Sequence, residues 1–210
     1  MSYETVFEMY RRGHNPKKAA DWLLADEDGW SIAHTAAAEN RLPASFDDWE
    51  LTDNAGVAVA HIYVTVNVLP SCFTQWGLKN PSGETVAHIA AAFGTLPKGF
   101  ENWGLVNSAG NTVAHTAART NHLPSDFKNW GLKNRQGETV AHIAAAFGTL
   151  PHNFMVPEVL SMVDNDGESV EEVLKKMANQ RKAEMAARIR ESGRGHINDA
   201  LDMLRNAPRR

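Results

Sequence analysis

The sequence lacks the raw material for several classes of protein. Its single cysteine, Cys72, excludes an intramolecular disulfide and a zinc site made of several thiolates. No apolar run approaches the roughly 20 residues that a membrane-spanning helix needs. Charged residues interrupt the apolar positions of residues 1–22, unlike a secretory signal. We therefore expect a cytoplasmic protein with no membrane partner, which leaves its delivery into another cell open.

The motifs of common catalytic and cofactor sites are also missing. The sequence contains no GxGxxG, no phosphate-binding GKS or GKT and no HExxH. The DNDG segment from Asp164 to Gly167 begins like a calcium loop, but no glutamate stands at its twelfth position. Nothing in the sequence places a base beside Cys72. These absences predict a protein that is not an enzyme and binds no cofactor and no metal.

Charge is divided unevenly along the chain, although the formal net charge is only −4. Residues 1–174 hold 21 Asp and Glu against 11 Lys and Arg, whereas residues 175–210 hold 4 against 10. The body is therefore acidic and the tail basic. Such a tail could touch an acidic protein, a nucleic acid, a second copy or its own body.

The positive content of the sequence is a repeat of 27 residues. Ala-His pairs recur at this period, and Trp, Leu-Pro and Phe recur with them, so four independent marks share one spacing. The histidines are His34, His61, His88, His115 and His142; the tryptophans after Trp22 are Trp49, Trp76, Trp103 and Trp130; the phenylalanines are Phe46, Phe73, Phe100 and Phe127, with Phe154 at the end.

Each unit has the punctuation of a helical hairpin. Gly83 supplies a turn, and Thr85 stands where a helix N-cap belongs, matched by Ser31, Ala58, Thr112 and Thr139. Only Gly or Asn occurs where the first helix should stop in a left-handed cap, at Asn40, Asn67, Gly94, Asn121 and Gly148. A shorter second helix is expected to open at each Leu-Pro proline, with Leu96, Phe100 and Trp103 on its buried face.

The segment GETVAHIAAAFG, residues 83–94, resembles the ankyrin repeat signature. Val86 and Ala87 depart from it, and the period is shorter than the ~33 residues usual in that family. The resemblance implies an all-α, ankyrin-like solenoid of helix-turn-helix repeats, with an N-terminal helical cap and amphipathic C-terminal helices. We expect capping helices at 1–21, five repeats at 22–156, a cap and long amphipathic helix at 157–192 and a basic helical tail at 193–210, with Gly193-Arg194-Gly195 interrupting the two helices.

The histidine ladder has two readings, a metal site and a structural role. Adjacent helices pack ~8–10 Å apart, which is too far for equivalent imidazoles to share a zinc ion. The resemblance implies instead that each histidine hydrogen-bonds to backbone in the neighbouring turn. We therefore assign structural roles to the five repeat histidines and to the core residues Trp49, Trp76, Trp103, Trp130, Phe46, Phe73, Phe100 and Phe127.

The resemblance also implies a protein-protein interaction scaffold, with an inhibitor or an effector within that class, that holds a protein partner on a concave face. Predicted contact residues are Trp30, Val57, Glu84, Asn111 and Glu138 on the turn edge, and Val66, Phe93, Arg119 and Phe147 on the helices. The alternative for Phe93 and Phe147 is packing against neighbouring helices.

Two features remain open. Tyr63-Val64 replaces the Ala-Ala of the other units, which predicts a local change of curvature or a special contact. The basic C-terminal helices could dock on the body, form a homodimer or bind an acidic partner. Nucleic-acid binding through them is the alternative function, and it would weaken steeply with salt.

Overall fold

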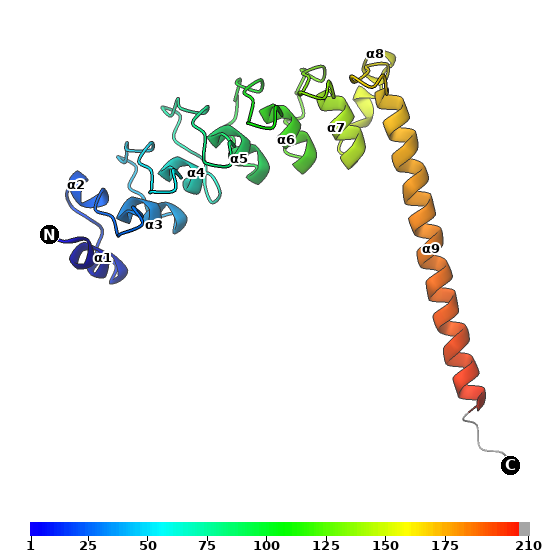
Figure 1. Ribbon diagram of the computed structural model, residues 1–210, viewed down its shortest axis with the longest axis horizontal. Helices are drawn as coiled ribbons and strands as arrows, with labels where there is room; N and C mark the ends of the chain where they lie inside the picture. The colour runs from blue at the N-terminus through cyan, green and yellow to red at the C-terminus, as the bar shows by residue number, and fades with distance from the viewer. Residues whose placement is uncertain (206–210) are drawn as a thin grey trace.

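The computed structural model describes residues 1–205, with side chains through residue 191, as a curved row of short helices followed by one long helix (Figure 1). No strand occurs in this part of the chain, so the all-α solenoid is confirmed. The helices in order are α1 (Tyr3–Arg11), α2 (Ala19–Trp22), α3 (Ile32–Ala38), α4 (Val59–Tyr63), α5 (Val86–Phe93), α6 (Val113–Thr120), α7 (Val140–Phe147), the 3-10 turn η1 (His152–Phe154), α8 (Pro157–Leu160) and α9 (Val170–Arg205).

One helix per unit forms where the sequence indicates it. In α5 the Thr85 Oγ1 accepts the backbone N–H of His88 at 3.3 Å, and Gly94 ends the helix at φ 72°. The N-caps of α3 to α7 are Ser31, Ala58, Thr85, Thr112 and Thr139, as predicted. Left-handed caps are confirmed at Asn40, Gly94, Asn121 and Gly148.

The second unit departs from this pattern. Helix α4 ends at Tyr63, with a right-handed cap at Val64, so the predicted left-handed cap at Asn67 is wrong. The Val64 side chain is fully buried, and the Tyr63 ring lies 5.0 Å from that of Trp49. Bulky and β-branched residues at a position that other units fill with alanine shorten the helix. The predicted change of curvature stays a prediction.

The second half of each repeat is built from two tight turns, so the expected second helix is wrong in this detail. In the third unit Phe100 N donates to Pro97 O at 3.1 Å, and Leu105 N donates to Asn102 O at 3.2 Å. Gly99 lies at φ 81°, outside any right-handed helix. A segment of this length gains too few hydrogen bonds to offset helix nucleation. Regular helical structure appears here only after α7, in η1 and α8.

The outer layer of the row is an alternating file of buried tryptophan and phenylalanine rings. Phe100 meets Trp76 and Trp103 edge to face, at 5.2 Å between ring centroids in both cases. The contacts continue from Trp22 to Phe154. Edge-to-face pairs add stabilisation beyond the area they bury. The inner layer consists of fully buried Val and Ala, which let neighbouring helices approach closely.

Helix α9 begins as a sixth unit that lacks its stop signal. Ser169 caps it, Val170 is fully buried, and the stop position is occupied by Ala178. The helix therefore continues to Arg205. The expected interruption at Gly193-Arg194-Gly195 is wrong, because a glycine within a helix costs only about 1 kcal/mol relative to alanine and does not forbid the helix. The last five residues of the predicted tail, 206–210, lie outside the described residues.

Stacking of the inter-repeat turns gives a first prediction. Gly83 and Gly56 have the same left-handed backbone, at φ 78° and 82°. A Cβ on Gly83 would lie 1.9 Å from Ser108 Oγ, whereas one on Gly56 would meet only Pro81 Cγ, at 3.5 Å. We expect Gly83→Ala to lower the free energy of unfolding more than Gly56→Ala, which pays only the ~1–2 kcal/mol left-handed cost. Urea denaturation measures both, and equal losses would contradict the steric argument.

The aromatic file gives a second prediction. Phe100→Ala should lower the free energy of unfolding by about 3–5 kcal/mol, because it empties a buried site between two indoles. Phe93→Ala, in the same unit but 57% exposed, is the matched control and should cost within about 0.5 kcal/mol. Similar denaturation midpoints for the two variants would remove Phe100 from the core.

Candidate functional site

The predicted contact residues lie in two rows along the helices of the repeats. Those on the helices are exposed: Val66 by 46%, Phe93 by 57% and Phe147 by 54%, with Arg119 exposed as well. The turn-edge residues Trp30, Val57, Glu84, Asn111 and Glu138 are only half-buried. We call the exposed side of α3 to α7, together with these turn edges, the helix face. In Figure 1 these helices project to the same side as α9.

A hollow of about 380 Å³ on the helix face brings five of the nine residues together. It lies across the fourth and fifth units. Its lining residues are Glu84, Asn107, Ala109, Asn111, His115, Thr116, Arg119, Glu138, Ile143 and Phe147. Trp30, Val57, Val66 and Phe93 lie outside this hollow, so the structure does not gather the whole predicted set at one point.

A ladder of side-chain amides supports the turn edge of the hollow. Asn107 Nδ2 donates to Glu84 Oε1 of the preceding unit at 2.9 Å. Asn134 Nδ2 donates to Asn111 Oδ1 of the preceding unit at 3.1 Å and to Glu138 Oε2 at 2.7 Å. The predicted contact residues on this edge are therefore held by the array itself.

Sequence reasoning missed Asn107 and Asn134, although the repeat carries a signal for them. The turn-starting residue is Asp26, Asp53 and Asp164 in the outer units but asparagine in the third to fifth. Either side chain can accept the backbone N–H groups of its own turn, as Asp53 does from Val57 and Asn107 from Asn111. Only asparagine also has a donor left for the neighbouring unit.

The charged groups of the hollow have no ion-pair partners within residues 1–191. Neither Glu84 nor Glu138 pairs with a cation there, and Arg119 pairs with no carboxylate. Ile143 and Phe147 form an apolar wall beside them. The hollow therefore offers charges of both signs and an apolar contact, which suits a polypeptide segment.

The repeat histidines link each unit to the next. His88 Nδ1 lies 2.7 Å from Thr85 Oγ1, and His88 Nε2 lies 2.9 Å from the carbonyl oxygen of Asn111. His34, His61, His115 and His142 reach the carbonyls of Val57, Leu78, Glu138 and Glu168 in the same way. In four units Nδ1 also accepts the N–H of the N-cap residue, which places the proton on Nε2.

This bonding also limits the chemistry of the imidazoles. His115 borders the hollow, yet both of its ring nitrogens are engaged, so it is not a free general base. Among residues 1–191 no three metal-ligating side chains converge. Burial lowers the pKa of His34, His61, His88 and His115 below the ordinary 6.5, outweighing the opposing effect of the carbonyl bonds.

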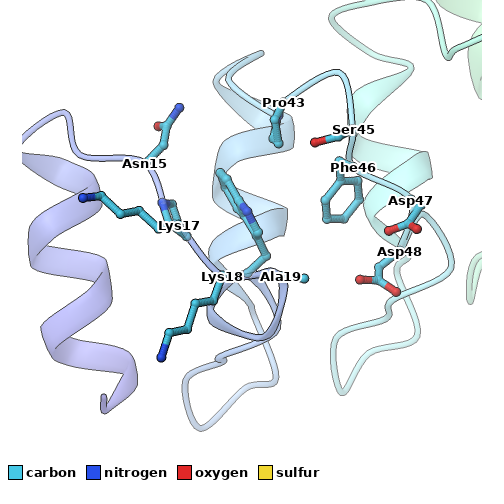
Figure 2. A pocket seen from close by; sticks show the side chains of 11 residues that line it. Asn15, Lys17, Lys18, Ala19, Pro43, Ser45, Phe46, Asp47 and Asp48 are labelled. Carbon is cyan, nitrogen blue, oxygen red and sulfur yellow. The ribbon is translucent and has the colours of Figure 1, made fainter.

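Two further hollows lie on the outer side of the row, and neither was predicted. The first, of about 220 Å³, is shown in Figure 2: Trp22 and Phe46 form its floor, Asp47 and Asp48 one rim, and Lys17 and Lys18 the other. We call it the N-terminal hollow. The second, of about 1030 Å³, crosses the third and fourth units between Phe100 and Phe127. No helix of the described part of the chain is both long and apolar enough to cross a membrane.

The histidine links predict a loss of stability in acid. Their neutral form is favoured in the folded protein, whereas the unfolded chain takes up protons near pH 6.5. The unfolded state thus binds more protons below that pH, and the free energy of unfolding should fall as the pH drops from 7.5 to 5.5. Chemical denaturation at these two pH values measures the change.

His88→Gln is the informative variant for this effect. Glutamine keeps a capping-box acceptor at N3, the role that Glu172 plays for Ser169 in the sixth unit, but cannot titrate. We expect a loss of about 1–3 kcal/mol at pH 7.5, because the Asn111 carbonyl loses its donor, and a smaller pH dependence than in the parent protein. An unchanged pH dependence would show that His88 contributes nothing to it.

No family model and no curated protein sequence matches the chain. Solved structures do match it in fold. The ankyrin repeat domain of Bcl-3, of the IkappaB protein family, is 14% identical over 82% of this chain and 90% of that chain, with a TM-score of 0.50. A chain from the complex of the predatory endopeptidase Bd0816 of Bdellovibrio bacteriovorus with immunity protein Bd3460 is 18% identical over 74% and 94%, with a TM-score of 0.51. The chain has an ankyrin-like repeat fold.

Proposed function

We propose that the protein is a non-enzymatic interaction module that holds a protein partner on its helix face. The observation that carries the proposal is the exposure of Phe93 and Phe147. Each is more than half exposed on a helix whose other apolar residues are packed inside the array. Large apolar side chains left in water at matching positions of two units need a partner to cover them.

The surroundings of these phenylalanines support the same conclusion. Arg119 lies in the last turn of α6, between the helices that carry Phe93 and Phe147. Aromatic residues and arginine dominate the energetic centres of protein interfaces. The hollow beside Phe147 adds the free carboxylates of Glu84 and Glu138. A partner would bury the phenyl rings and pair its own charges with these groups.

The structural neighbours add a weaker argument. Bcl-3 carries the same kind of repeat domain, and the other neighbour comes from a structure that its name describes as an endopeptidase in complex with an immunity protein. Complex formation on such a repeat fits an inhibitor or an effector role for the present chain. A catalytic role gains no support from its ladder histidines, whose ring nitrogens are committed to the fold.

The test is the double substitution Phe93→Ser with Phe147→Ser. We expect the free energy of unfolding to change by no more than about 1 kcal/mol in total, since both sites are exposed. Partner binding should weaken by about 30-fold or more for each substitution if the rings are hot spots. Affinity capture from an extract of the source cells, followed by titration of the captured protein, measures the loss.

A matched control is available outside the helix face. Val106 and Val163 are exposed by 49% and 45% in the segments that lead into the turns. Val106→Ser with Val163→Ser removes similar apolar surface and should leave binding intact. Binding that survives loss of the phenylalanines, or a folded state that does not, would refute the assignment of Phe93 and Phe147 to the interface.

A further inference from the structure

Helix α9 leaves the array after two turns. Val170 is buried, and Val173, Leu174 and Met177 are half-buried against the last units. Every residue from 178 to 191 is exposed. At 1.5 Å per residue the 36-residue helix is about 54 Å long. Long helices in globular proteins owe most of their stability to packing of an apolar face, so the free part of α9 lacks what usually stabilises a helix.

One side of the free part is apolar and basic together. With 3.6 residues per turn, Lys182, Met185 and Ile189 lie within about 60° of one another around the axis. Met185 and Ile189 are 67% and 63% exposed. Glu184 and Glu191 fall on the opposite side. We call the side formed by Lys182, Met185, Ile189 and Arg190 the arm face.

The cations of the arm face are available for a partner. Earlier in the helix Lys175 pairs with Glu171 at 2.7 Å, one turn away. Lys182 and Arg190 have no acidic residue three or four positions away in either direction, and within residues 1–191 neither forms an ion pair. Arg181 differs, because its guanidinium lies over Gly148 at the end of α7. Residues 175–191 carry six basic against two acidic side chains.

A surface with complementary properties lies at the other end of the molecule. Residues 22–75 carry eight acidic side chains and one basic side chain, Arg41, which pairs with Glu39 at 3.1 Å. The N-terminal hollow lies in this region. Its floor is aromatic, and Asp47 and Asp48 project at its rim (Figure 2). An apolar side chain flanked by a cation is the kind of group that fits such a hollow.

The two surfaces cannot meet within one molecule. The row of units separates them, and α9 departs as a continuous helix from the end opposite the N-terminus (Figure 1). Their complementarity can therefore be satisfied only between molecules. We infer that α9 is a dimerisation arm: its arm face docks on the N-terminal hollow of a second copy, with Met185 or Ile189 on the aromatic floor and Lys182 against Asp47 and Asp48. Two such contacts, related by a two-fold axis, close the assembly.

Sedimentation velocity on the full-length chain tests this inference. We expect the mass of two chains at low salt and a shift toward one chain at 0.5 M salt, because salt screens exposed charges. Lys182→Glu with Arg190→Glu should give single chains, and so should Asp47→Lys with Asp48→Lys. An equimolar mixture of these two variants should regain the two-chain mass, because each reversed arm now meets a reversed hollow and each native arm a native one.

Three controls make the outcome decisive. Lys98→Glu with Lys128→Glu makes the same change in net charge at exposed sites in the third and fourth units and should leave the dimer intact. Circular dichroism should show unchanged helix content in every variant. Phe93→Ser with Phe147→Ser should also leave the dimer intact, which separates this inference from the proposed partner site.

Several results would overturn the inference. A parent protein that sediments as one chain at low salt would do so, and so would an Asp47→Lys, Asp48→Lys variant that stays dimeric, because that result means arm-to-arm pairing. A mixture that fails to associate would also refute it. If a DNA duplex instead binds the single-chain protein through Lys182 and Arg190, the arm face serves nucleic acid and the dimer is rejected.

Discussion

The imidazole that joins one unit to the next is the interaction on which the rest of the array depends. In each of the five repeats it reaches the cap of its own helix through Nδ1 and a backbone carbonyl further along the chain through Nε2. It thereby satisfies polar backbone groups that burial would otherwise leave unpaired. One residue type thus fixes where a helix begins and how far away the next unit lies. The aromatic file and the alanine rows can then pack with a constant repeat.

The last unit shows the same logic through an exchange of residues. Its N3 position holds Glu172, which bonds to the hydroxyl and the backbone N–H of Ser169. A carboxylate completes the cap of its own helix but has no second nitrogen with which to hold a following unit. Loss of the histidine and loss of the Gly or Asn stop occur together in this unit. The row therefore ends where both of its linking devices end.

Much of the fold was predictable because each unit carries its own local signals. The N-caps and four of the five left-handed stops follow from residue type alone, since few residues tolerate those conformations. The second helix was wrongly predicted because the proline and the apolar spacing of Leu96, Phe100 and Trp103 are compatible with consecutive turns as well as with a helix. At Asn67 the sequence was misleading, because packing of Val64 and Tyr63 ended the helix before the stop residue could act.

The candidate site was harder to predict, for a physical reason. Exposure of Phe93 and Phe147 follows from their place on the helix, but the hollow and its amide ladder arise from distances between units. Asn107 contacts Glu84 although 23 residues separate them, and only the stacked array brings them together. The partition of the outer face into hollows depends in the same way on how neighbouring turns meet.

The constant linkage between units has a consequence for how such a protein changes length. Because residues 76–102 contain one complete set of caps, aromatic rings and an imidazole, their duplication supplies every group that its neighbours require. Gain or loss of one such block would move the acidic and basic ends apart or together by one interhelical spacing, about 8–10 Å, while leaving each end unchanged. Reach and chemistry are thus encoded separately, so selection could adjust the span between the two termini as freely as links are added to a chain.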